Sequence, residues 1–99
     1  MAVTYYQKAC NAGDSMGCRN LGNHLRDGDG APKDTQQAIM YFQKSCDGGD
    51  SVGCRNLAIL YDAGTAVAQD LGKAKQYYQK GCTLKDQTSC DTLKNAKFQ

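Results

Sequence analysis

Residues 41–57 of this 99-residue chain read YFQKSCDGGDSVGCRNL and contain the pattern from which the fold can be predicted. It recurs as YYQKACNAGDSMGCRNL at residues 5–21 and as YYQKGCTLKDQTSCDTL at residues 77–93. The copies are spaced by 36 residues, because the first Cys of each lies at position 10, 46 or 82. Self-similarity at a fixed period of this length is typical of a repeat protein, in which each copy forms one structural unit.

Each repeat has the pattern of two helices. Within residues 38–46, Ala38, Tyr41, Phe42 and Cys46 recur at helical spacing and form one stripe. A second stripe follows the turn, and Gly-Asp-Ser at 13–15 and 49–51 places a helix-ending glycine beside an N-cap residue. The sequence therefore predicts six helices, near residues 2–12, 15–27, 35–47, 51–63, 71–83 and 87–98.

The resulting prediction is an all-α fold, a solenoid of antiparallel helix hairpins forming one domain over residues 1–99. It divides into a half repeat (1–14), two repeats (15–50 and 51–86) and a final half repeat (87–99). Lys94 and Lys97 stand where the earlier copies have small or apolar residues. Because the last unit of an array needs a polar outer face, we interpret residues 87–99 as a C-terminal cap. Divergence of a frayed terminus is the alternative.

The six cysteines form three pairs with the same spacing in every copy. Two Cys eight residues apart on one helix would lie roughly 12 Å apart, too far for a disulfide. Across a tight helical hairpin both can reach the same seam, so the sequence predicts disulfides instead of reduced, buried thiols. No Cys-x-x-Cys or zinc-ligand spacing occurs, so we expect no metal and no cofactor. The predicted bridges are Cys10–Cys18, Cys46–Cys54 and Cys82–Cys90.

Composition and charge exclude several classes of function. The formal net charge is only +2 and no basic run occurs, which gives nucleic-acid binding little support. No apolar stretch is long enough to span a membrane, and residues 1–5 do not begin a signal peptide. Six cysteines in so small a domain are typical of an exported protein, so we expect a secreted or periplasmic location.

The repeats resemble Sel1-like repeats, which are related to the tetratricopeptide repeat. The phrase Tyr-Gln-Lys-x-Cys and the Cys pairs resemble, more narrowly, the cysteine-rich branch typified by the Helicobacter cysteine-rich proteins. This resemblance implies a right-handed α/α solenoid that binds proteins, and some members of the branch are reported to bind or slowly hydrolyse β-lactams. The residues that carry it are Leu21-Gly22, Leu25, Gly28-Asp29-Gly30, Asp34, Ala38 and Tyr41-Phe42.

In the related tetratricopeptide fold the first helix of each repeat lines the concave face. Here those helices are 15–27 and 51–63, and their positions outside the core stripe should face a partner. Arginine and asparagine side chains suit the carbonyls or carboxylate of a peptide; the alternative for Asn20 and Asn56 is that they lock neighbouring helices. The predicted partner-binding residues are Arg19, Asn20, Asn23, Arg26, Arg55, Asn56, Ile59 and Asp62.

A catalytic site finds no support in the sequence. His24 is the single histidine and has no counterpart in the other repeats, so we interpret it as a packed or solvated side chain. The serine-enzyme motifs Ser-x-x-Lys and Lys-Thr-Gly are absent. We therefore predict a non-catalytic protein- or peptide-binding module. The alternatives are a periplasmic immunity-type protein that neutralises a toxic effector and a weak penicillin-binding or β-lactamase activity.

Overall fold

The computed structural model describes residues 2–64 and 67–99, so Met1, Thr65 and Ala66 of the predicted domain lie outside the described residues. The described part of the chain is entirely helical between its turns and loops, as predicted. Its elements are α1 (Ala2–Asn11), α2 (Ser15–Asp27), α3 (Thr35–Asp47), α4 (Ser51–Ala63), α5 (Leu71–Thr83), α6 (Gln87–Thr92) and a 3-10 helix, η1 (Ala96–Phe98).

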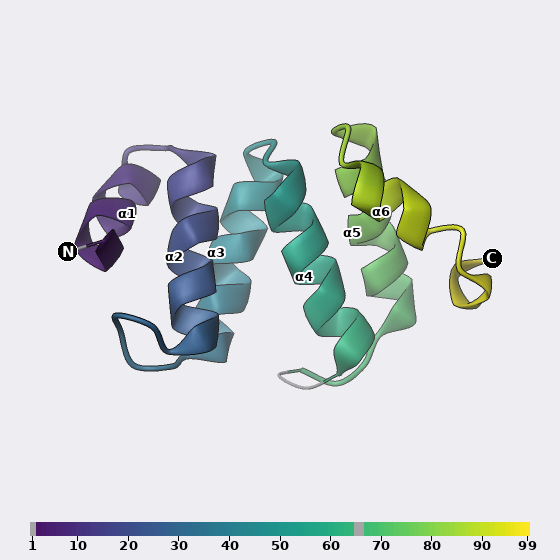
Figure 1. Ribbon diagram of the computed structural model, residues 1–99, viewed down its shortest axis with the longest axis horizontal. Helices are drawn as coiled ribbons and strands as arrows, with labels where there is room; N and C mark the ends of the chain where they lie inside the picture. The colour runs from purple at the N-terminus through teal and green to yellow at the C-terminus, as the bar shows by residue number, and fades with distance from the viewer. Residues whose placement is uncertain (1, 65–66) are drawn as a thin grey trace.

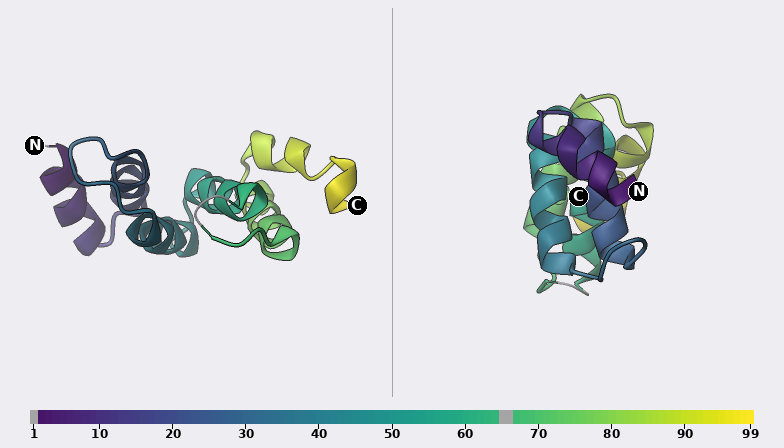
Figure 2. Two further views of the ribbon diagram at one scale, coloured as in Figure 1. Left: turned by 90° about the horizontal axis from the view of Figure 1, so that it is seen from below. Right: turned by 90° about the vertical axis from the view of Figure 1, so that its left-hand side faces the viewer.

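The helices stack side by side into an elongated array with the two termini at opposite ends (Figure 1). Its dimensions are 42 × 26 × 15 Å. Helices α2, α4 and α6 lie on one side of the array, whereas α3 and α5 lie on the other (Figures 1 and 2). Each α-helix packs against the next, and α2 also contacts α4 directly. We call α2, α4 and α6 the A helices, and α1, α3 and α5 the B helices.

Aspartates begin five of the six α-helices. The carboxylate of Asp34 accepts a hydrogen bond from the Gln37 N–H at 3.1 Å, and Asp70 does the same for Lys73 at 3.0 Å. These bonds satisfy N–H groups that have no partner inside the helix. At its other end α2 stops at Gly28, whose φ of 69° is a left-handed conformation that favours glycine.

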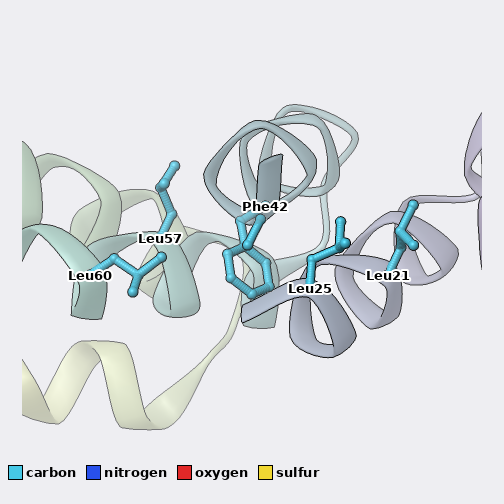
Figure 3. Close-up of a cluster of buried hydrophobic side chains, with 6 residues drawn as sticks. Leu21, Leu25, Phe42, Leu57 and Leu60 are labelled. Atoms are coloured by element: carbon cyan, nitrogen blue, oxygen red, sulfur yellow. The ribbon is translucent and has the colours of Figure 1, made fainter. Parts of the chain in front are cut away.

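The larger core cluster is centred on Phe42, which is fully buried. Figure 3 shows its ring between Leu21 and Leu25 of α2 and Leu57 and Leu60 of α4. One B-helix aromatic thus joins two successive A helices into a continuous core. Gly22 permits this approach, since a Cβ at that position would lie 2.7 Å from the Phe42 ring.

The predicted helix over residues 87–98 is wrong in its second half. Helix α6 ends at Thr92, and the chain turns before η1 returns Phe98 to the core at 3% exposure. Phe98 contacts Tyr78 edge-on at 5.4 Å between ring centroids, within a second cluster that includes Ala58 and Ala74. The register of Leu60 is occupied here by Ala96, which is too small to cover Tyr78. The turn supplies that cover instead.

Candidate functional site

Three disulfides hold the tight hairpins, at the predicted positions Cys10–Cys18, Cys46–Cys54 and Cys82–Cys90. The paired Cα atoms lie 4.5, 4.5 and 4.7 Å apart, within the range that the bridge geometry allows. Each bridge ties a B helix to the A helix that follows it. The start of every A helix, and hence the side chains of its first turns, is therefore positioned covalently.

The predicted arginines Arg19 and Arg55 each pair with the aspartate that immediately precedes the next A helix. Arg19 Nε donates to Asp50 Oδ2 at 2.7 Å, and the two side chains are 19% and 10% exposed. Arg55 Nη1 lies 3.7 Å from Asp86 Oδ1, in the same register one repeat later. Each arginine thus pairs with the carboxylate that precedes the next A helix, Arg19 through a hydrogen bond that restrains its guanidinium and Arg55 through a longer ion pair.

Asp50 differs from the other N-cap aspartates because its carboxylate makes no hydrogen bond to the α4 backbone. It accepts from Arg19 instead, whereas Asp86 caps Ser89 at 3.1 Å and lies farther from its arginine. These two aspartates were not predicted from the sequence as partners of Arg19 and Arg55. The available signal was an Arg and an N-cap Asp separated by 31 residues in both repeats.

Two of the three predicted asparagines, Asn23 and Asn56, contact each other across neighbouring helices. Asn56 Nδ2 donates to Asn23 Oδ1 at 3.1 Å, a bond that joins α4 to α2. Both side chains are partly buried, as is Asn20. The bond lies between the same two A helices as the Arg19–Asp50 pair, so polar contacts fasten this side of the array at two points.

Arg26 and Asp62 lie at the far ends of their helices and bind other groups. Arg26 Nε donates to Asp27 at 2.9 Å, and this hydrogen bond lowers the pKa of the Asp27 carboxyl. Its guanidinium also lies 5.8 Å from the centre of the Phe42 ring. Asp62 pairs with Lys97 at 2.8 Å and so anchors the C-terminal turn. Arg26 and Asp62 therefore do not form one cluster with Arg19.

Ile59 is the apolar member of the predicted set and is 44% exposed on α4. Ile59 occupies the position equivalent to Asn23, which accepts a hydrogen bond from Asn56, and to Asn95, the N-cap residue of η1. Because an isoleucine side chain has no donor or acceptor, it forms no polar contact between the A helices at this position. Among the predicted residues, the A helices thus combine one exposed apolar side chain, Ile59, with two arginines that pair with aspartates.

His24 has a local structural role. Its ring stacks on Tyr6 at 5.6 Å between centroids, and Nδ1 lies 2.8 Å from the carbonyl oxygen of Asp29. The histidine therefore braces the loop after α2 against α1. Among residues 2–64 and 67–99, no cluster of three or more His, Cys, Asp or Glu side chains is placed to hold a metal ion. None of the described helices has the length and apolarity needed to cross a membrane.

Comparison with known families gives one match. The Sel1 repeat model matches residues 1–14, 15–50 and 51–86. No curated protein matches the chain in sequence.

Solved structures that are similar to the chain include the following three. Cysteine-rich protein B of Helicobacter pylori superposes with a TM-score of 0.87 at 32% identity, over 92% of this chain and 68% of that one. A Sel1 repeat protein from Oxalobacter formigenes gives 0.82 at 29% identity, over 88% and 36%. The protein c5321, a protective antigen of uropathogenic Escherichia coli strains, gives 0.83 at 30% identity, over 88% and 19%.

Proposed function

The chain belongs to the Sel1 repeat family, and we propose that it is a non-catalytic module of an exported bacterial protein that binds a protein or peptide through its concave face. Family membership supports the non-catalytic, protein-binding role. Sel1 repeats generally mediate protein–protein interaction and generally form non-catalytic scaffolds. Individual residues support the binding face, and the three disulfides support export.

One observation carries the choice of face: Arg19 and Arg55 are held in the same register of successive repeats by Asp50 and Asp86. A guanidinium has five N–H donors, and Arg19 uses only Nε toward Asp50. Its other donors are fixed in position without being used on that carboxylate. Donors held in place before binding lose less conformational entropy when a ligand arrives, which favours binding of carbonyl or carboxylate groups.

Ile59 adds an apolar contact on the same helix as Arg55. Its side chain projects from the second A helix and is 44% exposed, next to polar positions that are partly buried. An apolar anchor beside fixed donors is the arrangement by which repeat proteins and other peptide-binding folds recognise a short chain segment. We propose that a partner places one apolar side chain on Ile59 and its backbone carbonyls or a carboxylate toward the arginines.

Peptide selection tests the face directly. A phage library of random 12-residue peptides would be selected on the oxidised chain, and bound peptides would be measured by isothermal calorimetry. We expect Ile59→Lys to weaken binding by about tenfold or more, since it removes the apolar anchor. Met40→Lys is the matched control, because Met40 on α3 is similarly exposed, at 49%, on the other side of the array. Equal effects of the two substitutions, or a larger effect of Met40→Lys, would overturn the proposal.

Export is supported by the three disulfides, which persist in oxidising compartments and are rare in the cytosol. Intact mass of natively purified, unreduced protein tests it. We expect the mass to be lower than that of the fully reduced chain by the six hydrogens lost in forming three disulfides, with all bridges mapped by peptide analysis. Six free thiols would place the protein in a reducing compartment and contradict export. The immunity and β-lactam alternatives stay predictions, and a flat trace with a chromogenic β-lactam would remove the latter.

A further inference from the structure

The chain contains three Asp-Gly bonds: Asp27-Gly28, Asp29-Gly30 and Asp47-Gly48. Aspartate isomerises most readily before glycine, because glycine has no Cβ to hinder its own amide nitrogen when that atom approaches the aspartate side chain. The nitrogen attacks the side-chain carboxyl and closes a succinimide ring. Since the three bonds join the same two residue types, differences in their reactivity depend on what the fold does to the nitrogen and to the carboxyl.

The glycine nitrogens of two of these bonds are already engaged. Gly28 follows α2 and Gly48 follows α3, and each N–H donates to a carbonyl oxygen of the last turn of its helix. The bond from Gly48 to the Lys44 carbonyl is 3.0 Å long. Either nitrogen must give up this hydrogen bond before it can attack a carboxyl, which lowers the population that can react.

The carboxyl groups of the same two bonds are also engaged. Arg26 donates to both oxygens of Asp27, at 2.9 and 3.2 Å, and this hydrogen bonding lowers the pKa of the Asp27 carboxyl. Asp47 accepts from Gln43 at 3.0 Å and from Lys80 at 3.2 Å. A carboxylate held in its ionised form has no hydroxyl to lose as water, so these contacts protect Asp27 and Asp47 from ring closure.

The bond between Asp29 and Gly30 has neither protection. It lies in the loop between α2 and α3, at the edge of the array opposite the disulfide-linked hairpins (Figure 1). The Gly30 N–H has no hydrogen-bond acceptor in the described part of the chain, and Gly30 is exposed with a φ of 75°. The Asp29 side chain is 79% exposed, and its Oδ2 lies 3.7 Å from His24 Nδ1, beyond hydrogen-bond distance.

We propose that Asp29 is a site of spontaneous isomerisation to isoaspartate, a modification that the fold directs to this one Asp-Gly bond. The Gly30 nitrogen bonds to Cγ of the protonated Asp29 carboxyl, and the carboxyl hydroxyl leaves with the amide proton as water. Water then adds to either carbonyl of the succinimide. Addition at Cγ restores aspartate, whereas addition at the main-chain carbonyl breaks the original peptide bond and leaves the chain joined through Cγ. Water is the only co-reactant, and nothing is oxidised or reduced.

Isomerisation changes a contact that braces the loop. His24 Nδ1 lies 2.8 Å from the main-chain carbonyl oxygen of Asp29, and the His24 ring stacks on Tyr6 of α1. In isoaspartate this carbonyl becomes a free carboxylate and the main chain gains one carbon. We therefore expect the amide resonances of Tyr6 and His24 to shift in the isomerised chain. Ile59 and the two arginines of the proposed binding face lie outside this loop, so the inference is independent of the proposed function.

Accelerated ageing followed by peptide mapping tests the proposal. The oxidised chain is kept at physiological temperature in mildly acidic buffer, because the reacting carboxyl must be protonated. After reduction and tryptic digestion, peptide 27–33 contains two of the bonds and peptide 45–55 contains the third. Electron-transfer fragmentation then locates isoaspartate within each peptide. We expect about fivefold more isoaspartate at position 29 than at position 27 or 47, since opening one backbone hydrogen bond reduces the reactive population by about that factor.

The unfolded chain and two variants are the controls. Reduced, alkylated protein in denaturant has the same three bonds without their hydrogen bonds, so all three positions should react at similar rates. Asp29→Glu lengthens the side chain, which makes ring closure much slower, and should abolish the modification at position 29. Asp27→Glu is the matched variant in the same peptide and should leave the yield at position 29 unchanged. Both substitutions keep the charge, and circular dichroism verifies that both variants fold.

The proposal would be overturned by equal yields at the three positions of the folded chain, or by a higher yield at position 27 or 47. The same ratio of yields in the folded and the unfolded chain would also overturn it, because sequence alone would then set the reactivity. Absence of isoaspartate at position 29 of the folded chain, while the unfolded chain forms it, would show that the loop protects this bond and would equally contradict the proposal.

Discussion

Phe42 and Tyr78 occupy the same register in successive repeats, yet their surroundings are built in different ways. Phe42 lies between leucines of α2 and leucines of α4, so regular helices cover it on both sides. Tyr78 has Ala58 of α4 on one side, while its other side is covered by Phe98, from a turn at the end of the chain. The first junction thus depends on repetition, whereas the second depends on a single residue that the repeat does not contain.

The difference shows how Tyr78 is covered where the last copy departs from the repeat pattern. Phe42 is covered by large apolar residues at two positions of the next A helix, Leu57 and Leu60. In the last copy the first is retained as Leu93 and the second becomes Ala96. Helix α6 ends at Thr92, and the chain then turns so that Phe98 of η1 packs against Tyr78 in place of the missing larger side chain.

The largest effect is expected from removing the ring of the regular junction. Phe42→Ala should lower the free energy of unfolding by about 3–5 kcal/mol, the usual cost of deleting a fully buried aromatic together with the cavity it leaves. Urea titration followed by circular dichroism measures this cost. Met40→Ala is the control, since that side chain is half exposed on the same helix, and it should cost less than about 0.5 kcal/mol. Comparable losses would contradict the central place of Phe42.

The disulfides sharpen the same comparison. Replacing both Cys46 and Cys54 by Ala should cost about 2.5 kcal/mol from the released loop entropy alone, and somewhat more because both residues are fully buried. Cys82 and Cys90 are partly exposed, so their bridge should be the first to yield to a limiting reductant. Alkylation and peptide mass mapping would give the order. Reduction of Cys46–Cys54 first would show that the regular junction is the looser one.

The C-terminal turn provides the intermediate effect. Phe98→Ala should cost about 2–3 kcal/mol, the lower end for a buried aromatic, because the short 3-10 helix η1 can relax around the lost ring. Hydrogen exchange should then show faster exchange in α6 and η1 while α2 and α3 keep their protection. Uniform loss of protection across all helices would mean that the turn is part of the main cooperative unit.

The titration of the Tyr78 hydroxyl tests the same junction through the pH dependence of stability. Burial and the nearby Asp62 carboxylate raise the pKa of its hydroxyl to about 12 from the ordinary 10.0. Because the folded state holds the proton more tightly than the unfolded state, stability should be unchanged below pH 10 and fall between pH 10 and about 12. The slope should not exceed about 1.4 kcal/mol per pH unit. Tyr78→Phe should remove this part of the alkaline loss, and an unaltered profile would contradict the assignment.

Most of the fold could be predicted because the information is local and occurs three times. The Gly-Asp-Ser turns and the aromatic stripes give the bounds of α2 to α5 as the structure has them. The path after Thr92 could not be predicted in this way. Residues 93–98 continue a plausible helical pattern, and only the packing of Phe98 on Tyr78, twenty positions away, favours the turn.

The candidate site was less predictable for a related reason. Residue type and register placed Arg19 and Asn56 on the A helices, but they do not say which partners those side chains choose. An N-cap aspartate such as Asp50 can serve the helix backbone or a distant arginine, and the two uses have the same sequence. The structure separates them, since Asp50 takes the arginine and Asp86 serves chiefly its own helix.

That choice supplies the smallest effect in the comparison. Asp50→Asn keeps the shape of the side chain but removes the charge that Arg19 contacts at 2.7 Å, and should cost about 1 kcal/mol. Asp86→Asn should cost about half as much, because its arginine is 3.7 Å away and an asparagine can still cap Ser89. The two values, measured by urea titration at low and high salt, should converge as salt screens the closer pair. If Asp86→Asn were the costlier change at low salt, the shared register of the two arginines would not reflect a shared role. The fixed donors of the proposed binding face would then be confined to the second repeat.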